Sequence, residues 1–466
     1  MPPQRAGRVR RWLPRGVAAA LVCNLLAAVV LAAAVRTADT GGSGSTEPQA
    51  SAHGSGSSHA RPLPGAPGAG TARDPATVEQ VRKLLARRAE AVRSGDRAAF
   101  LATIASSARR FRVDQRRLFS NLTKLPLAHW SYEISRATVP APRRLANPEP
   151  GTWTPRITLH YQLDGFDRRP ITRTRYLTVS RVPGRGWLFT GDGSAGSAGP
   201  ANHRGDPAIW DFGRLEAVRG DHTLVLGAGA EQSLLRSLAD RLDRAVSVVS
   251  GVWGEQWSQR AVVVVPPGRA EATAIAGGRQ SLTQLAGLAT VVSGPAGVPP
   301  AGSGDRIVLA PDNFDRLTPV GRQVVLTHEL THVATRGSTS EATPLWLVEG
   351  FADYVGYRAV DVPVRKAALE LAGAVQAGRV PDQLPSRSDF GAGNSQLSQA
   401  YEAAWLACRL IAHSYGQDQL VALYRETASR DGPPRQVVAD SFADVLGVSL
   451  PRFTERWRSY MREQLT

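Results

Sequence analysis

The stretch His328-Glu329-Leu330-Thr331-His332 decides how the rest of this sequence is interpreted. Residues four apart share one face of a helix, so His328 and His332 can present two imidazoles to the same metal ion. Glu329 lies beside them and would act as a general base toward water on that metal. A catalytic Zn²⁺ needs a third protein ligand and one open position. The stretch therefore predicts a zinc-bearing helix with its third ligand elsewhere in the chain.

A third candidate ligand lies in the segment from Trp346 to Tyr354. Glu349 comes seventeen positions after His332. Asp353 lies one turn beyond Glu349 on the same helical face, where it could accept the spare N–H of a ligand histidine and fix its orientation. The alternative is a buried core helix with two hydrogen-bonded histidines, but that alternative does not predict Glu349 or Asp353.

Start and stop signals divide this region into two helices. Thr318-Pro319 is typical of a helix start and Arg336-Gly337 of a helix end, and Thr343-Pro344 repeats the start signal. If the short loop folds the two helices into an antiparallel hairpin, Glu349 comes level with His332.

These motifs resemble those of the gluzincin zinc metallopeptidases, in particular the peptidase MA-like group of bacterial extracytoplasmic proteins. The carrying residues are His328-Glu329-x-x-His332 and Trp346-Leu347-x-Glu349-Gly350-x-Ala352-x-Tyr354, and the resemblance covers about residues 205–466. It implies His328, His332 and Glu349 as zinc ligands, Glu329 as base and Asp353 as the aspartate that orients a ligand. Larger relatives often have a longer gap before the third ligand, so the connecting loop here must be tight.

The resemblance also implies a donor that stabilises the oxyanion from a later segment of the chain. Tyr401, at the start of an expected helix, is our candidate for this catalytic role, and Tyr354, Tyr357 and His413 are rivals. Aromatic packing between C-terminal helices is the alternative explanation for Tyr401.

The amino terminus predicts a membrane anchor. Residues 1–15 are rich in arginine and would form a cytoplasmic basic segment, and residues 16–35 are apolar over a length that spans a bilayer as a helix. This arrangement predicts a single-pass protein of the cell membrane whose catalytic domain is extracytoplasmic. A cleaved signal peptide, followed by secretion, is the alternative. Residues 36–75 are rich in Gly, Ser and Pro and predict a disordered linker.

Residues 76–192 predict a small accessory domain of the α+β class. Residues 78–105 have a helical pattern, residues 157–163 alternate as a strand does, and residues 176–190 indicate a hairpin. Helices followed by a meander look like an NTF2-like domain, a cone-shaped fold that often has a binding cavity. A second linker follows at residues 193–206.

Residues 207–466 form the expected zinc metallopeptidase-like domain, with a mixed sheet and a helical subdomain. Strands are expected at 222–226, 261–265 and 306–310, and most of the chain beyond residue 363 is helical. In gluzincin-like folds a strand at the position of Arg306–Ala310 borders the cleft and pairs with extended substrate. An ordinary interior strand is an equally good interpretation.

Charge and cysteine content exclude several classes of protein. The formal net charge is +16, but the arginines are spread along the chain rather than gathered in one basic motif, which argues against nucleic-acid binding. The two cysteines, Cys23 and Cys408, provide neither a disulfide framework nor a thiolate zinc site.

The sequence as a whole predicts an extracytoplasmic, membrane-anchored zinc metallopeptidase that hydrolyses peptide bonds of a peptide or protein substrate, with Zn²⁺ as its cofactor. One alternative is a binding or scaffold protein of the cell envelope that keeps the metallopeptidase fold with weak or no turnover. Another is a small-ligand site in the accessory domain, with an incidental metal site. The sequence does not determine the natural substrate or the oligomeric state.

Overall fold

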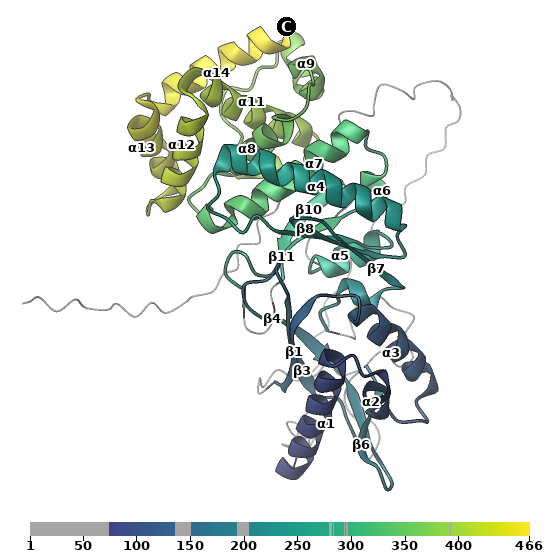
Figure 1. Cartoon of the computed structure of the whole chain (residues 1–466). Coiled ribbons are helices and arrows are strands. Elements are labelled where there is room, and N and C mark those ends of the chain that lie inside the picture. Colours follow the sequence, from purple (N-terminus) through teal and green to yellow (C-terminus); the bar gives the residue numbers. More distant parts are fainter. Residues whose placement is uncertain are drawn as a thin grey trace, which may run out of the picture.

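The structure is a computed structural model that describes residues 74–135, 151–192, 205–278, 282, 284–292, 294, 297–391 and 393–466. Its elements lie in three tiers (Figure 1). A small α+β part that begins the described chain lies at one end, a five-stranded sheet lies in the middle, and helices of the C-terminal half cover the far side of that sheet.

The N-terminal tier consists of helices followed by strands, as expected from the sequence. The Gly95-Asp96 break separates the first two helices, and Asp74 and Asp96 accept the capping hydrogen bonds at their starts. The elements are α1 (Pro75–Arg93), α2 (Arg97–Ala102), α3 (Arg109–Leu122), β1 (Leu127–Ile134), β2 (Thr152–Trp153), β3 (Arg156–Leu163), β4 (Ile171–Tyr176), β5 (Thr178–Val182) and β6 (Gly186–Gly191).

The strands of this tier form two sheets instead of the expected single meander. One has the order β1-β3-β4 and the other β2-β5-β6. The chain passes from one sheet to the other at Leu177, a buried residue between the end of β4 at Tyr176 and the start of β5 at Thr178. Pairing of β5 with β6 is irregular at that point, between Thr178 and Val179, which is how a strand bends out of one sheet.

The middle tier is a mixed sheet of order β10-β11-β9-β8-β7. Strands β8, β9 and β11 are parallel, and β7 and β10 pair antiparallel at the two edges. The strands are β7 (Leu215–Arg219), β8 (Thr223–Ala228), β9 (Ala261–Val265), β10 (Gly287–Val291) and β11 (Asp305–Leu309). The expected strands at 222–226, 261–265 and 306–310 correspond to β8, β9 and β11.

Most of the regular structure outside these sheets is helical. The helix α4 lies against β7 and β8 and packs against α7, which in turn packs against α8. The helices are α4 (Gln232–Trp253), α5 (Arg269–Ile275), α6 (Pro311–Phe314), α7 (Pro319–Thr335), α8 (Leu345–Tyr357), α9 (Val364–Ala367), α10 (Leu369–Gln376), α11 (Leu397–Tyr415), α12 (Gln417–Ser429), α13 (Pro434–Leu446) and α14 (Leu450–Leu465).

The two faces of the five-stranded sheet belong to different cores. On β9, Val263 and Val265 pack with the helices of the C-terminal half, whereas Val262 and Val264 pack with the N-terminal tier. Successive strand residues point to opposite faces, so one run of valines supplies both cores. The accessory part and the sheet are therefore not packed as separate units, because they share one hydrophobic core.

The expected fold class needs correction at the amino terminus. The structure is mixed α+β, but the apolar segment 16–35, together with residues 1–15 and most of the first linker, lies outside the described residues. Within the described part of the chain, no helix has both the length and the apolar character needed to cross a bilayer. The anchor helix is consequently not part of the fold described here.

Candidate metal centre

The helix α7 carries the HExxH stretch into the core. Thr318 accepts a hydrogen bond from the Gly321 N–H at 3.1 Å, and Pro319 occupies the first turn, so the expected start signal is used. The His328 and Glu329 side chains are fully buried, and His332 is 5 % exposed. Polar side chains at such depth require partners, which the next helix supplies.

The helix α8 places a carboxylate opposite the two histidines. It begins directly after Pro344 and contains Glu349 and Asp353 one turn apart. Gly356 of α8 faces α7, where a Cβ atom would lie 3.1 Å from the Val324 carbonyl oxygen, so glycine lets the two helices approach closely. The hairpin expected from the start and stop signals is present.

Three ligand atoms converge between these helices. The Nε2 atoms of His328 and His332 are 2.8 Å apart, and Glu349 Oε2 lies 3.4 and 3.5 Å from them. Among the described residues, these three side chains form the group of His, Cys, Asp or Glu that could hold a metal ion.

Asp353 holds the first histidine by its other ring nitrogen. The His328 Nδ1 atom lies 2.8 Å from Asp353 Oδ1, and a proton on Nδ1 leaves the Nε2 lone pair directed at the shared point. Burial alone lowers the pKa of His328, but the negative charge of Asp353 and the nearby glutamates outweighs burial and raises that pKa to about 10. Nε2 is therefore a strongly basic atom, and a metal ion would bind there in place of a proton. His328 is thus the more strongly oriented of the two imidazoles.

Glu329 is held by one oxygen only. Its Oε2 accepts a hydrogen bond from the Ala289 N–H at 2.5 Å, whereas Oε1 is buried without a hydrogen-bond partner in the described structure. Burial raises the pKa of this carboxyl group above its ordinary value, and the two histidines only partly oppose that effect. A carboxylate with a raised pKa is a better proton acceptor than a surface glutamate.

The N–H that binds Glu329 belongs to an edge strand that the sequence reasoning missed. Hydrogen bonds to the neighbouring strand alternate along an antiparallel pair. Ala286 and Val292 take part in the ladder to β11, and Ala289 points to the opposite edge, toward α7. The run Thr290-Val291-Val292 is the β-branched signal that could have identified β10.

The structure decides between the two interpretations of the strand at Arg306–Ala310. Arg306 lies in β11, which has β10 on one side and β9 on the other, so Arg306–Ala310 is the interior strand of the two interpretations. Gly287 of β10 sits close to the ligand helix, where a Cβ atom would come within 3.2 Å of Glu329 Cγ. Any larger residue at this position would crowd the base.

The donor set fits zinc. Two imidazole nitrogens and one carboxylate are the three protein ligands that a catalytic zinc site requires. Both carboxylate oxygens of Glu349 are buried and have no hydrogen-bond partner within the described residues, which is costly unless a cation compensates them. Burial raises the pKa of Glu349, but His332 and His328 outweigh burial and lower it, so the group stays ionised.

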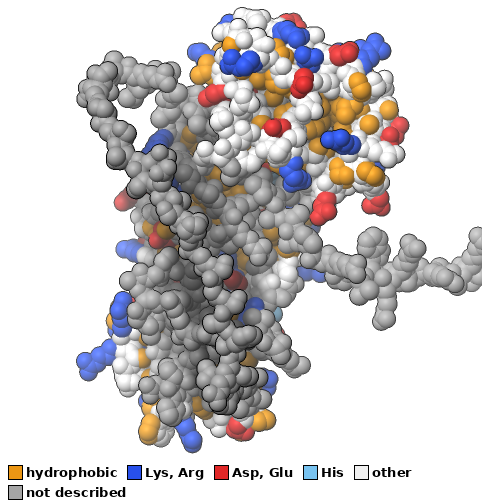
Figure 2. Space-filling model, turned by 180° about the vertical axis from the view of Figure 1, so that it is seen from behind, with side chains coloured by type: hydrophobic (Ala, Val, Ile, Leu, Met, Phe, Trp, Pro, Cys, Tyr) orange, Lys and Arg blue, Asp and Glu red, His pale blue; other side chains and the backbone are white. Residues whose placement is uncertain are grey.

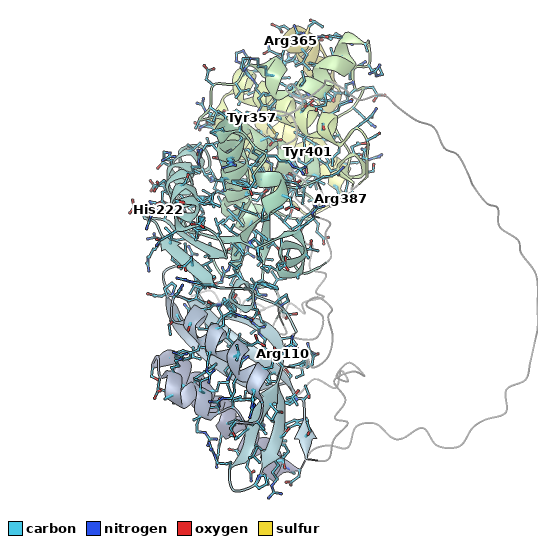
Figure 3. All side chains as sticks on the ribbon, turned by 90° about the vertical axis from the view of Figure 1, so that its right-hand side faces the viewer. Arg110, His222, Tyr357, Arg365, Arg387 and Tyr401 are labelled. Carbon is cyan, nitrogen blue, oxygen red and sulfur yellow. The ribbon has the colours of Figure 1, made fainter. Side chains whose placement is uncertain are left out.

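Tyr401 is buried on α11, and its ring meets Phe390 edge-on with centroids 5.1 Å apart. The rival tyrosines have other neighbours: the Tyr357 ring packs against Trp405 at 4.8 Å, and the Tyr354 hydroxyl donates to Gln417 at 3.4 Å. Tyr357 and Tyr401 both lie in the helical tier (Figure 3). His413 is exposed near the end of α11. The oxyanion role of Tyr401 stays a prediction.

Comparisons with known proteins give weak likenesses. No protein-family model matches the chain, and no curated protein matches it either. Among solved structures, it is similar to a two-domain M1 zinc metallopeptidase with a glutamate-to-alanine substitution, bound to L-arginine, at 14% identity and a TM-score of 0.33 over 53% of this chain. A similar structure bound to L-tryptophan gives 15% identity and a TM-score of 0.29 over 53% of this chain.

The chain spans about half the length of those two structures, 51% in each case. Both neighbours are zinc metallopeptidases, and at these TM-scores the likeness does not decide what this chain does. The NTF2-like resemblance of the N-terminal tier has no counterpart among these matches.

Proposed function

We propose that this protein is a zinc-dependent hydrolase of peptide bonds. The observation that carries the proposal is the convergence of two imidazole nitrogens and the buried Glu349 carboxylate on one point. A second buried carboxylate, Glu329, adjoins that point and accepts the Ala289 N–H on the edge of β10 that faces α7. A site that only held a structural metal would have no use for this additional base.

His328, His332 and Glu349 would hold the zinc ion, which when bound acts as a Lewis acid that polarises a carbonyl group and makes water more acidic. Glu329 would accept the water proton at Oε1, because Oε2 is already held by the Ala289 N–H. It would then return the proton to the leaving amine. Asp353 would keep His328 in one tautomer throughout.

An extended peptide is the class of substrate that this arrangement favours. The Ala289 N–H is held by Glu329, and the other main-chain groups on this edge of β10 would pair with a peptide backbone, as edge strands do in other complexes. Such pairing would place a scissile carbonyl group near the metal ligands without selecting particular side chains.

The proposal is tested with a Glu329→Gln variant. We expect about one zinc ion per chain in the parent and in the variant, measured by elemental analysis, because Glu329 is not a ligand. Hydrolysis of a mixed peptide library, followed by mass spectrometry, should fall by about 10²-fold or more in the variant. Glu341→Gln, which changes an exposed glutamate in the loop between α7 and α8, should keep the parent rate.

Equal hydrolysis by the parent and the Glu329→Gln variant would refute the assigned base. A parent that binds zinc and cleaves no library peptide would favour the scaffold alternative instead.

A further inference from the structure

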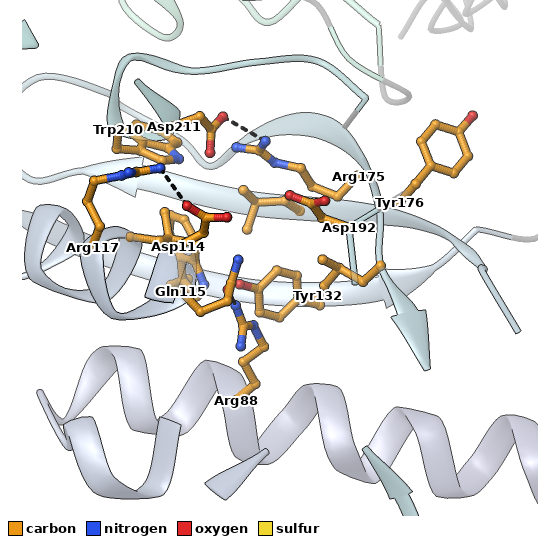
Figure 4. Close-up of a pocket in the computed structure, with 14 residues that line it drawn as sticks. Arg88, Asp114, Gln115, Arg117, Tyr132, Arg175, Tyr176, Asp192, Trp210 and Asp211 are labelled. Carbon is orange, nitrogen blue, oxygen red and sulfur yellow. Dashed lines mark hydrogen bonds and ion pairs between the residues drawn. The ribbon is translucent and has the colours of Figure 1, made fainter. Parts of the chain in front are cut away.

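A small cavity in the N-terminal tier contains a buried positive charge that the metal centre does not use. The cavity has a volume of about 60 Å³ and lies between α1, α3 and the strands (Figure 4). Arg88 projects from α1 into its floor and is 1 % exposed. Its guanidinium group donates to Gln115 through one nitrogen, and the Tyr132 hydroxyl interacts with the cation. Nε and Nη1 make no hydrogen bond of good geometry among the described residues, and no anion neutralises the charge.

Other ionic groups at the cavity are paired with each other. Arg175 bonds Asp211 at 2.7 Å, and Arg117 bonds Asp114 at 3.0 Å, both visible in Figure 4. Asp192 lines the same cavity, stands beside Arg175 in this view and has an interaction of its own. Arg88 has no carboxylate partner within the described part of the chain.

A second buried donor without an acceptor belongs to a residue that lines the same cavity. Trp130 lines the cavity at 2 % exposure, and its indole N–H has no hydrogen-bond partner in the described structure. Buried donors normally find partners, and one left unpaired destabilises the folded protein. The guanidinium carbon of Arg88 lies 3.9 Å from the centre of the Phe100 ring, which stabilises the cation from one side without accepting its N–H groups.

We propose that this cavity binds a small organic carboxylate. A carboxylate supplies the acceptor oxygens that Arg88 and Trp130 lack and neutralises the buried charge. Besides Gln115 and the ionic groups described above, the walls are apolar or aromatic, including Leu159, Leu177 and Trp210, and this part suits a short hydrocarbon group. The volume accommodates a molecule of a few heavy atoms or the carboxyl end of a peptide. This proposal does not depend on the peptidase activity.

The test uses propionate as the probe and the whole protein as the receptor. Propionate should raise the melting temperature of the parent in proportion to the logarithm of its concentration, and isothermal titration should give a dissociation constant. Propionamide, which has the same shape without the charge, should have no effect. Acetyl-diglycine with a free carboxyl end and its amidated form are then compared. Binding of the free form at least as tight as that of propionate indicates a peptide terminus as the source of the carboxylate, and binding of propionate alone indicates a small free acid.

Arg88→Met removes the charge and keeps the length of the side chain. It should fold, because an apolar residue of similar volume replaces a buried charge, and it should weaken propionate binding at least tenfold. Trp130→Phe keeps a ring but removes the N–H, and should weaken binding severalfold. Arg110→Met, which changes an exposed arginine of α3 (Figure 3), should bind like the parent.

Propionate that fails to bind the parent at tens of millimolar would overturn the proposal. The proposal would also be overturned if the Arg88→Met variant and the Trp130→Phe variant each bound propionate as tightly as the parent. Binding of inorganic phosphate in place of propionate would overturn the carboxylate assignment.

Discussion

Glu349 and Asp353 both lie on α8 and both contact His328, but only Glu349 is placed to bind the metal ion. Glu349 lies on the side of the shared point, 3.4 Å from His328 Nε2, and Asp353 lies 2.8 Å from Nδ1 on the opposite side of the ring. A ligand contributes directly to metal affinity, whereas a residue behind a ligand contributes through orientation and basicity. Substitution of Glu349 and substitution of Asp353 should therefore lower zinc affinity by different amounts.

We expect Glu349→Ala to abolish stoichiometric zinc binding with both histidines in place. Asp353→Asn should weaken zinc affinity by about 10–100-fold, because the amide can still contact His328 but carries no charge. Competition with a zinc chelator measures both effects, and circular dichroism checks that each variant is folded. Unchanged zinc affinity in Glu349→Ala would exclude Glu349 as the third ligand.

The packing of α8 against its neighbouring helices depends on glycines, which have no functional side chain. Gly350 of α8 faces α11 so closely that a Cβ atom would lie 2.3 Å from the Ala404 carbonyl oxygen. The glycine in the motif Glu349-Gly350 thus positions the ligand helix against its other neighbour. Interhelical close approach, rather than metal binding, explains why a glycine follows the third ligand.

Another buried carboxyl group, that of Glu402, joins α11 to α10. The Glu402 Oε2 atom accepts a hydrogen bond from the Leu371 N–H at 2.6 Å, in the first turn of α10. Burial and the adjacent carboxyl group of Glu370 raise the pKa of Glu402 to about 10, although the N–H groups oppose them. The native protein therefore carries a proton on Glu402 that the unfolded chain releases near its ordinary pKa.

This proton makes stability fall as pH rises. From about pH 4.5 up to about pH 10 the folded state binds one proton more than the unfolded state, so Glu402 reduces the free energy of unfolding by at most about 1.4 kcal/mol per pH unit. Glu402→Gln, which resembles the protonated acid, should gain stability relative to the parent as pH increases from 5 to 9. Denaturant unfolding at several pH values measures the difference.

A difference between Glu402→Gln and the parent that stays constant over this pH range would contradict the protonated state of Glu402. Glu455→Gln, at an exposed glutamate of α14, is the control and should give no such trend.

Across the whole molecule, the N-terminal tier and the sheet are joined by a buried ion pair as well as by their shared core. Asp167, between β3 and β4, accepts two hydrogen bonds from the Arg306 guanidinium group of β11, at 3.0 and 2.9 Å. The side chains of Asp167 and Arg306 are 0% and 5% exposed, and the Gly304 and Leu163 N–H groups also bond the carboxylate. The pair lies on the face of the sheet opposite the metal ligands.

Asp167→Asn should lower the free energy of unfolding by about 3–5 kcal/mol, because it leaves the Arg306 charge buried without a partner. Asp312→Asn breaks the pair with Arg269, whose side chains are 46% and 47% exposed, and should change stability by no more than about 1 kcal/mol. Urea unfolding followed by tryptophan fluorescence compares the two. Equal effects of both substitutions would show that the buried pair does not join the two tiers.

The surface charge of the molecule has no single basic face in the rear view. Lys and Arg side chains alternate with Asp and Glu over the C-terminal helices where side chains are drawn (Figure 2). The described C-terminal helices therefore present charges of both signs on this face rather than one basic patch.

Local signals in the sequence predicted the helices of the site and their boundaries. The Thr318-Pro319 start, the four-residue spacing of His328 and His332 and the Thr343-Pro344 start all depend on neighbours within one or two turns. Periodicity and capping are local properties, so the sequence alone could predict the two helices and the ligand that each one carries. That Glu349 meets the two histidines depended on the short loop folding the helices into a hairpin.

Long-range packing decided what local signals could not. The short strand β10 lies at the edge of the five-stranded sheet because only β11 pairs with it, and α7 lies along its other side. In the same way, β9 alternates between two cores, and Arg88 and Trp130 meet at one cavity although distant in sequence. Strand order and shared cores depend on residues far apart in the chain, whose contacts form only when the whole molecule folds.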